Sequence, residues 1–211
     1  MQIEKKQIAY NRVARSGAIK YIVIHDTGNK SKGADADSHF RYFNGGNRNS
    51  SADFFVDDKT VLQVNDYTKY YTWHVGDGKG KYGITNQNSV GIEICVNADG
   101  NYDGAYAKAA ELTKYLMKQL GIGAERVVRH YDASRKNCPA SMSANNWALW
   151  EKFKQLIREE VKMAECKFTD ISGHYGEKQI REVFEMGIMN GVDETHFEPD
   201  KPVTRAQAAI I

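Results

Sequence analysis

The sequence has little excess charge and few cysteines, and both shortages exclude classes of protein. Among 211 residues, Lys and Arg number 29 and Asp and Glu number 27, which leaves a net charge of +2. Nucleic-acid-binding proteins carry a larger basic excess, so we expect no nucleic-acid partner. Three cysteines are too few, and odd in number, for a disulfide framework. Each is therefore expected to be buried, metal-binding or catalytic in a reducing compartment.

Long apolar runs are also lacking. No stretch approaches the roughly 18 to 20 apolar residues that a membrane span requires, so membrane insertion is not expected. Residues 1–6 (MQIEKK) contain no apolar segment of a secretory signal, which predicts synthesis in the cytoplasm. The 41% hydrophobic content, with 12 Tyr and 8 Phe, is nevertheless sufficient for a folded core.

The strand predicted at residues 89–96 has two chemically different faces. Val90, Ile92 and Ile94 share one face by the two-residue period, whereas Glu93 and Cys95 lie on the other. A second β-branched run at residues 21–24 is typical of a strand buried on both faces.

Strand and helix patterns alternate over the first 160 residues. This alternation predicts an α/β fold with a mixed central sheet flanked by helices. The remaining expected elements are a hairpin of residues 53–56 and 60–64, strands at 70–75 and 126–130, and helices at 34–43, at 103–120 and from Ser143 onward.

The composition changes near residue 160 and divides the chain. We expect a large first domain at 1–160, a charged linker at 161–167 and a small helical unit at 168–211. In that unit, helices are predicted from His174 to Met186, stopped by Gly187, and from Thr204. A unit of about 44 residues without disulfides is marginal alone, so it is expected to be incomplete, to lean on the first domain or to be mobile.

His25, His130 and Cys138 are candidate metal ligands. Two imidazoles and a thiolate are ligands that zinc prefers, and three protein ligands leave a fourth position for water. The residue types alone leave an alternative open, because a His at a strand end is often simply packed and a single Cys is often a small core residue.

Three further positions have both a functional and an ordinary interpretation. Glu93 could act as a general base beside a metal, or could lie on a solvated strand face. Lys136 could stabilise an oxyanion, or could be a surface lysine. Trp73 and His74 could line a groove for sugar or peptide, or could pack as a structural pair.

Five short segments follow one another in order along the first domain: Ile22–Gly28 (IVIHDTG), Trp73–Gly76 (WHVG), Asn88–Glu93 (NSVGIE), Arg129–His130, and Lys136–Pro139 (KNCP). Through these segments, residues of about 20 to 158 resemble the type-2 family of zinc-dependent N-acetylmuramoyl-L-alanine amidases. That family includes phage endolysins and peptidoglycan recognition proteins.

The resemblance implies a role for each candidate residue. Zinc is expected on His25, His130 and Cys138, with Glu93 as the acid/base residue and Lys136 as a transition-state stabiliser. The substrate groove is expected to be lined by Trp73, His74 and Asp53. The implied reaction hydrolyses the amide bond between N-acetylmuramic acid and L-alanine in peptidoglycan, as in an endolysin or autolysin that is released on lysis or through a holin-type lesion.

Two positions depart from the family pattern. Many relatives carry an aromatic residue and a His where this chain has Ala52 and Asp53. A tyrosine that assists catalysis in part of the family is therefore absent, which leaves the acid/base role to Glu93. Pro139 is followed by Ala140 instead of the more common Gly, which is expected to alter only the local turn.

The tail from Phe168 resembles an S-layer homology repeat. Its recurring segments are 168–175, 187–191, 197–200 and 204–206. Such repeats imply anchoring to a secondary cell-wall polymer. One repeat is found, and it stops inside its last expected helix.

Other functions remain possible at this point. A non-catalytic peptidoglycan-binding module of the same fold is one, although such proteins commonly lack the cysteine ligand that Cys138 supplies. A wall-anchored structural protein, with the first domain as a spacer, is another. A different zinc hydrolase is less favoured, because the sequence contains no His-Glu-x-x-His pattern.

Overall fold

The computed structural model describes residues 1–158, 166–185 and 189–202. The chain divides into two compact units, Met1–Arg158 and Glu159–Ile211. The expected stop at Gly187, the helix from Thr204 and most of the linker at 161–167 lie outside the described residues.

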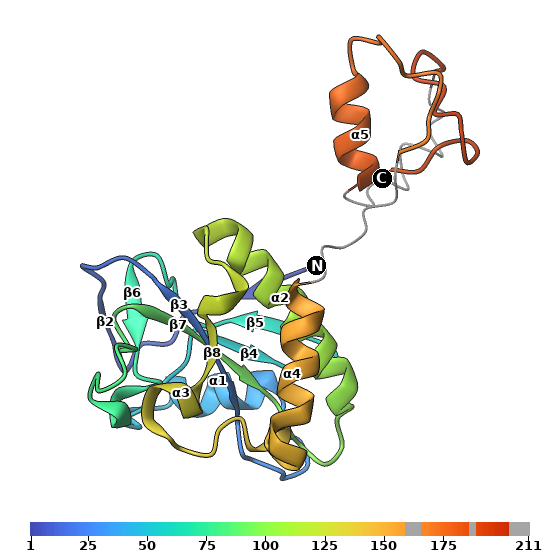
Figure 1. The fold of residues 1–211 in the computed structure, drawn as a ribbon. Coiled ribbons are helices and arrows are strands. Elements are labelled where there is room, and N and C mark those ends of the chain that lie inside the picture. Colours follow the sequence, from blue (N-terminus) through green and yellow to red (C-terminus); the bar gives the residue numbers. More distant parts are fainter. Residues whose placement is uncertain (159–165, 186–188, 203–211) are drawn as a thin grey trace. The chain divides into compact units, whose positions relative to one another are not determined.

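A six-stranded mixed sheet forms the centre of the first unit, which confirms the expected α/β class (Figure 1). Neighbouring strands are parallel except for the β4–β5 hairpin. In spatial order the strands are β1 (Glu4–Lys5), β5 (Val61–Gln63), β4 (Phe54–Val56), β7 (Ser89–Ile94), β3 (Tyr21–Asp26) and β8 (Val127–Arg129).

A second, two-stranded sheet corrects one expectation. The strand predicted at 70–75 is only three residues long, β6 (Tyr70–Thr72), and pairs antiparallel with β2 (Arg12–Ala14). It does not extend the central sheet. After Thr72 the chain bends, and the backbone N–H groups of His74 and Val75 both donate to the Asn86 side chain instead of to a neighbouring strand.

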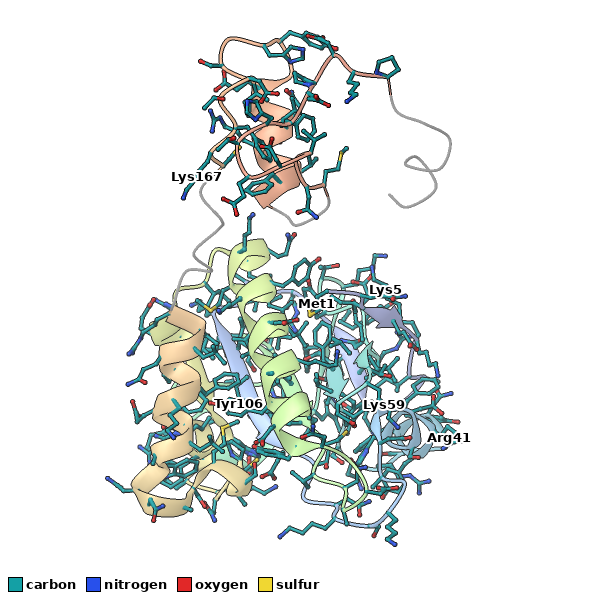
Figure 2. All side chains as sticks on the ribbon, turned by 90° about the vertical axis from the view of Figure 1, so that its right-hand side faces the viewer. Met1, Lys5, Arg41, Lys59, Tyr106 and Lys167 are labelled. Atoms are coloured by element: carbon teal, nitrogen blue, oxygen red, sulfur yellow. The ribbon has the colours of Figure 1, made fainter. Side chains whose placement is uncertain are left out.

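Two long helices cover one face of the central sheet (Figure 2). Helix α2 (Tyr102–Leu120) ends at Gly121, whose φ of 62° allows the left-handed cap. Helix α4 (Ala144–Arg158) lies beside it, and Tyr106 of α2 donates its hydroxyl to the Leu149 carbonyl of α4 at 3.1 Å. These helices bury the alternate apolar residues of β3 and β7, among them Ile24 and Ile92, both with no exposed surface.

Shorter helices cover the opposite face at its two sides. Helix α1 (Ala36–Asn44), capped by the Asp35 carboxylate, packs on β4 and β5 through Phe55 and Leu62. Helix α3 (His130–Ser134) packs on β8 and β3. The strand expected at 126–130 therefore ends at Arg129, and His130 opens a helix. Strand β7 lies between these two covered regions in the sheet order, with β3 beside it.

Short turns complete the first unit: the 3₁₀ segments η1 (Gly76–Gly78), η2 (Ala124–Arg126) and η3 (Ala140–Met142). The three cysteines are free thiols. Within the described ranges, no helix has the length and apolar character that a bilayer crossing needs.

The second unit has a small apolar core built from Phe168, Ile171 and Ile180. Its described helix is α5 (Glu177–Glu185), so the helix expected from His174 begins three residues later. The reason is local: Gly173 has a φ of 76°, and the His174 N–H closes a turn onto the Ile171 carbonyl. The Asp170 carboxylate accepts the Phe197 and Glu198 N–H groups, which ties the loop to the start of the unit.

Candidate metal centre

Strands β3 and β7 place two of the predicted residues side by side. The parallel register pairs His25 with Glu93, so both side chains leave the same face of the sheet. Ile24 before His25, and Ile92 and Ile94 on either side of Glu93, point into the apolar core instead. Each strand end therefore delivers one polar side chain to the face that α2 and α4 leave uncovered.

The next strand delivers His130 to the same edge. Strand β8 is parallel to β3 with Arg129 opposite Ile24, so His130 follows at the level of His25. The Asp132 carboxylate accepts the Arg129 N–H and fixes the start of α3. The chain then loops back, and the Tyr131 N–H donates to the Cys138 carbonyl at 2.9 Å. That bond closes the loop and brings Cys138 to the two imidazoles.

One ligand atom each from His25, His130 and Cys138 lies within 4.8 Å of the others. The Cys138 Sγ is 3.8 Å from the His25 Nδ1. All three side chains are buried, with 1%, 4% and 5% of their residues' surface exposed, respectively. The structure thus joins three residues that are separated by up to 113 positions in the sequence.

These residues fit a zinc ion. The His130 Nδ1 is buried and has no hydrogen-bond partner, which costs about 1–3 kcal/mol unless something else satisfies it. Burial lowers the pKa of both His25 and His130, so their imidazoles are neutral and can offer lone pairs. Burial also raises the pKa of the Cys138 thiol, and metal coordination displaces such a proton.

The far nitrogen of each imidazole is hydrogen-bonded. The His25 Nε2 lies 3.0 Å from the His74 Nδ1, and the His130 Nε2 lies 2.8 Å from the Asp77 Oδ1. Such contacts are typical of metal-binding histidines, because they fix which nitrogen faces the metal. The sequence did not single out Asp77, and its only signal is its position three residues after His74.

Glu93 faces the same cluster. One carboxylate oxygen, Oε1, is 3.8 Å from the His25 Nδ1, and the other, Oε2, is buried without a partner. Burial, reinforced by the nearby charge of Asp26 and opposed by Lys136, raises the pKa of Glu93 to about 8. A carboxyl group with a pKa near neutrality, beside a ligand cluster, is suited to accept and return a proton.

Lys136 lies on the loop between α3 and Cys138 and is exposed. Its positive charge contributes to lowering the pKa of both His25 and Glu93, so its ammonium acts on the cluster electrostatically.

Trp73 and His74, both expected to line a substrate groove, differ in exposure. Trp73 is partly exposed, and its backbone N–H is held by the Ser51 hydroxyl at 2.8 Å. His74 is buried, with 7% of its surface exposed, and its ring lies behind His25. Burial lowers the pKa of His74 to about 3, so the ring is neutral. His74 therefore contacts a candidate ligand residue, and its place in a substrate groove stays a prediction.

Asp53 has a different role from the one expected. It is fully buried, and its carboxylate accepts hydrogen bonds from the Gly91 N–H at 2.8 Å, the Thr72 hydroxyl at 3.0 Å and the Asn65 amide at 2.7 Å. These bonds join the segment before β4 to β7 and β6. The side chain has no surface for a substrate to touch, so the expected substrate contact of Asp53 is corrected to a structural role.

Comparison with known sequences identifies related proteins over the first unit. The sequence model of the N-acetylmuramoyl-L-alanine amidase family matches residues 15–141, and that of the S-layer homology domain matches residues 167–209. The chain is 40% identical over 132 residues to the N-acetylmuramoyl-L-alanine amidase CwlH of Bacillus subtilis (strain 168), a match that covers 63% of this chain and 52% of the relative. It is 38% identical over 146 residues to the amidase XlyA of the same strain, covering 69% and 46%.

Solved structures agree with these matches. The catalytic domain of XlyA superimposes with a TM-score of 0.67 at 37% identity, covering 74% of this chain and 99% of that domain. The structure of PlyL superimposes with a TM-score of 0.64 at 29% identity, covering 74% and 97%. The chain spans about half the length of the curated relatives it matches.

Proposed function

The chain belongs to the N-acetylmuramoyl-L-alanine amidase family, and from this premise we propose that it is a zinc-dependent peptidoglycan hydrolase. The bond cleaved is the amide between the lactyl group of N-acetylmuramic acid and the L-alanine of the stem peptide. Support comes from the family match over residues 15–141 and from the amidase names of the relatives.

His25, His130 and Cys138 are the residues that would hold the zinc ion. Their donor set of two neutral imidazoles and one thiol is the kind that catalytic zinc sites use, with a fourth position left for water or substrate. When bound, zinc supplies Lewis acidity, which polarises a carbonyl and lowers the pKa of water.

Glu93 and Lys136 carry the proton and charge changes in this proposal. Glu93 takes a proton from the attacking water and returns it to the leaving amine of L-alanine, which balances the reaction as the C–N bond breaks. Its raised pKa supports both steps, because the carboxyl group can be protonated and deprotonated near neutral pH. The Lys136 ammonium stabilises negative charge as it develops on the carbonyl oxygen.

The division into units supports a division of labour. We propose residues 1–160 as the catalytic domain, 161–167 as a linker and 168–211 as a unit that binds a secondary cell-wall polymer. The whole chain would then act at the cell wall as an endolysin or autolysin.

One observation carries the proposal. Three buried ligand atoms from distant segments meet within 4.8 Å, one of them lacks any other partner, and a largely buried carboxylate stands beside them. A module that only binds peptidoglycan has no need of such a cluster.

The test pairs metal analysis of the purified full chain with mass spectrometry of the peptidoglycan it digests. We expect about one zinc per chain and products with a free L-alanine amine and an intact lactyl carboxylate. Products cut within the glycan or within the stem peptide would overturn the assigned bond. Stable binding to peptidoglycan without any cleavage would instead favour the non-catalytic module.

A further inference from the structure

We propose that His74 and Ser89 are positioning residues that hold the proton of His25 on Nε2 and so present its Nδ1 lone pair to the metal. This inference rests on the proposed zinc site and adds to it a set of residues behind the ligand. The three side chains form one line of hydrogen bonds, from the Thr85 carbonyl through Ser89 and His74 to His25.

The direction of this line follows from its far end. The Ser89 hydroxyl lies 2.6 Å from the Thr85 carbonyl, and because a carbonyl oxygen can only accept, the hydroxyl hydrogen points there. The Ser89 oxygen must then accept from the His74 Nε2 at 3.1 Å, which places the proton of His74 on Nε2.

The same logic continues to the metal ligand. The His74 ring is buried, and its two nitrogens contact Ser89 and His25, neither of which can balance a positive charge, so its Nδ1 carries a lone pair and accepts from the His25 Nε2 at 3.0 Å. The proton of His25 is therefore on Nε2. The Nδ1, which faces Cys138 at 3.8 Å, is left as a lone pair directed into the ligand cluster.

The backbone around His74 is built to hold the ring in this place. The Asn86 side-chain oxygen accepts both the His74 and the Val75 N–H, at 3.0 and 2.8 Å. On the other side, the ring lies against Gly91 of β7, where an added Cβ would come within 2.7 Å of the His74 Nδ1. A side chain at position 91 would push the ring away from His25, which gives a physical reason for glycine in the middle of this strand.

The second imidazole is supported in a different way. The His130 Nε2 donates to the Asp77 carboxylate, which also accepts from the Ser134 hydroxyl and whose side chain is 47% exposed. The Nε2 of His130 is thus hydrogen-bonded to a charged group near solvent. The Nε2 of His25 is instead hydrogen-bonded to the buried, neutral pair of His74 and Ser89, which we call the relay. Because an unpaired charge is costly in a buried position, a neutral relay is the arrangement that the interior behind His25 tolerates.

The test compares His74→Leu with His74→Asn in the full chain. Both side chains branch at Cγ and have similar size, but only Asn offers an oxygen near the position of the His74 Nδ1. Zinc affinity is measured by competition with a chromophoric chelator, after the metal has been removed. We expect His74→Leu to weaken zinc binding by about 10- to 100-fold, and His74→Asn to retain affinity within a few-fold of wild type.

Ser89→Ala gives an intermediate case. It removes the acceptor for the His74 Nε2 proton but leaves the ring in place, so the proton of His74 is free to move to Nδ1. We expect a smaller loss of zinc affinity than with His74→Leu. Thermal melting of each metal-free variant shows whether it is folded, and Ser89→Ala and His74→Asn decide the question if the Leu variant is not.

A second readout does not depend on zinc. The imidazole ¹⁵N shifts of His25 in the metal-free protein report which nitrogen carries the proton. We expect the Nε2–H form in wild type and His74→Asn, and a mixture of both forms in His74→Leu. Equal zinc losses in the Leu and Asn variants, no loss in folded His74→Leu, or an Nδ1–H form in wild type would overturn the relay. If wild type binds no zinc, the proposed function fails, whereas the ¹⁵N shifts still decide the relay.

Discussion

The two faces of strands β3 and β7 differ in chemistry although their residues alternate along the same backbone. On one face, Ile24, Ile92 and their neighbours pack beneath α2 and α4 without exposed surface. On the other, His25 and Glu93 stand side by side, and Glu93 keeps a buried oxygen without a partner. Burial of the apolar side chains on the first face stabilises the fold. The second face leaves polar groups without hydrogen-bond partners, and a bound ligand can supply those partners.

This difference separates stability from chemistry by a single step along the strand. A substitution on the apolar face is expected to lower the free energy of unfolding and leave the reaction alone. A substitution on the polar face is expected to slow the reaction without lowering the free energy of unfolding. Functional sites often carry groups that stability alone would not select, and the β3–β7 pair places both kinds of residue one position apart.

The largest effect on activity is expected from substitution of Cys138, and a second buried cysteine provides a matched control. Cys138→Ala removes the sulfur ligand, so zinc content should fall from about one per chain to near zero and activity by several orders of magnitude. Cys95 is also a buried free thiol but packs in the apolar cluster under α1. Cys95→Ala should keep zinc and activity and cost about 1 kcal/mol of stability.

Metal analysis and peptidoglycan turnover on the same preparations check this pair. Full activity in folded Cys138→Ala, or loss of zinc in Cys95→Ala, would mean that the sulfur ligand has been misassigned.

The next effect is expected at Glu93. Glu93→Gln keeps the size of the side chain but removes the proton acceptor, so kcat should fall by about 10²- to 10⁴-fold while zinc is retained. The free energy of unfolding should stay the same or rise, because a buried carboxylate oxygen without a partner is replaced by a neutral amide.

Glu111→Gln, an exposed change on α2, is the control for loss of a charge. The measurements are kcat, zinc content and a urea unfolding curve. Unchanged turnover in Glu93→Gln would move the acid/base role to another group.

The apolar face is tested one position away. Ile92→Ala leaves a cavity beneath α2 and α4 and should lower the free energy of unfolding by about 2–5 kcal/mol, whereas Ile92→Val should cost about 0.5–1.5 kcal/mol. Both variants should keep kcat within a few-fold of wild type when assayed well below their melting temperatures. A drop in kcat comparable to that of Glu93→Gln would show that the two faces are coupled.

The sequence alone could predict this alternation but not all of its consequences. The two-residue period correctly assigned Val90, Ile92 and Ile94 to one face of β7 and Glu93 to the other, because the pattern depends only on backbone geometry. The meeting of His130 with Cys138 depends on a loop and on the register of β8, which no local pattern encodes. There the resemblance to a family, not the spacing, supplied the prediction.

The supporting hydrogen bonds were beyond sequence reasoning. Ser89 and Asp77 carry no periodic or compositional signal, and they matter only because folding places them behind His74 and His130. The resemblance placed Asp53 in the substrate groove, whereas the structure buries its side chain completely. Its burial follows from three hydrogen bonds to segments that are distant in sequence, and such compensation cannot be seen before the fold is known.

The smallest effect on the chemistry is expected from the second unit. Both faces of the β3–β7 pair, and all residues of the candidate metal centre, lie within Met1–Arg158, which forms a compact unit with its own core. A chain ending at Arg158 should therefore hydrolyse a soluble muropeptide with kcat and KM within a few-fold of the full chain.

The core of the second unit is separate, formed around Phe168, Ile171 and Ile180. Its removal should reduce only retention on purified cell wall, measured by co-sedimentation beside the soluble assay. Loss of soluble activity in a folded, zinc-loaded 1–158 chain would show that the second unit contributes to catalysis. The residues of the β3–β7 pair would then not be sufficient to account for the reaction.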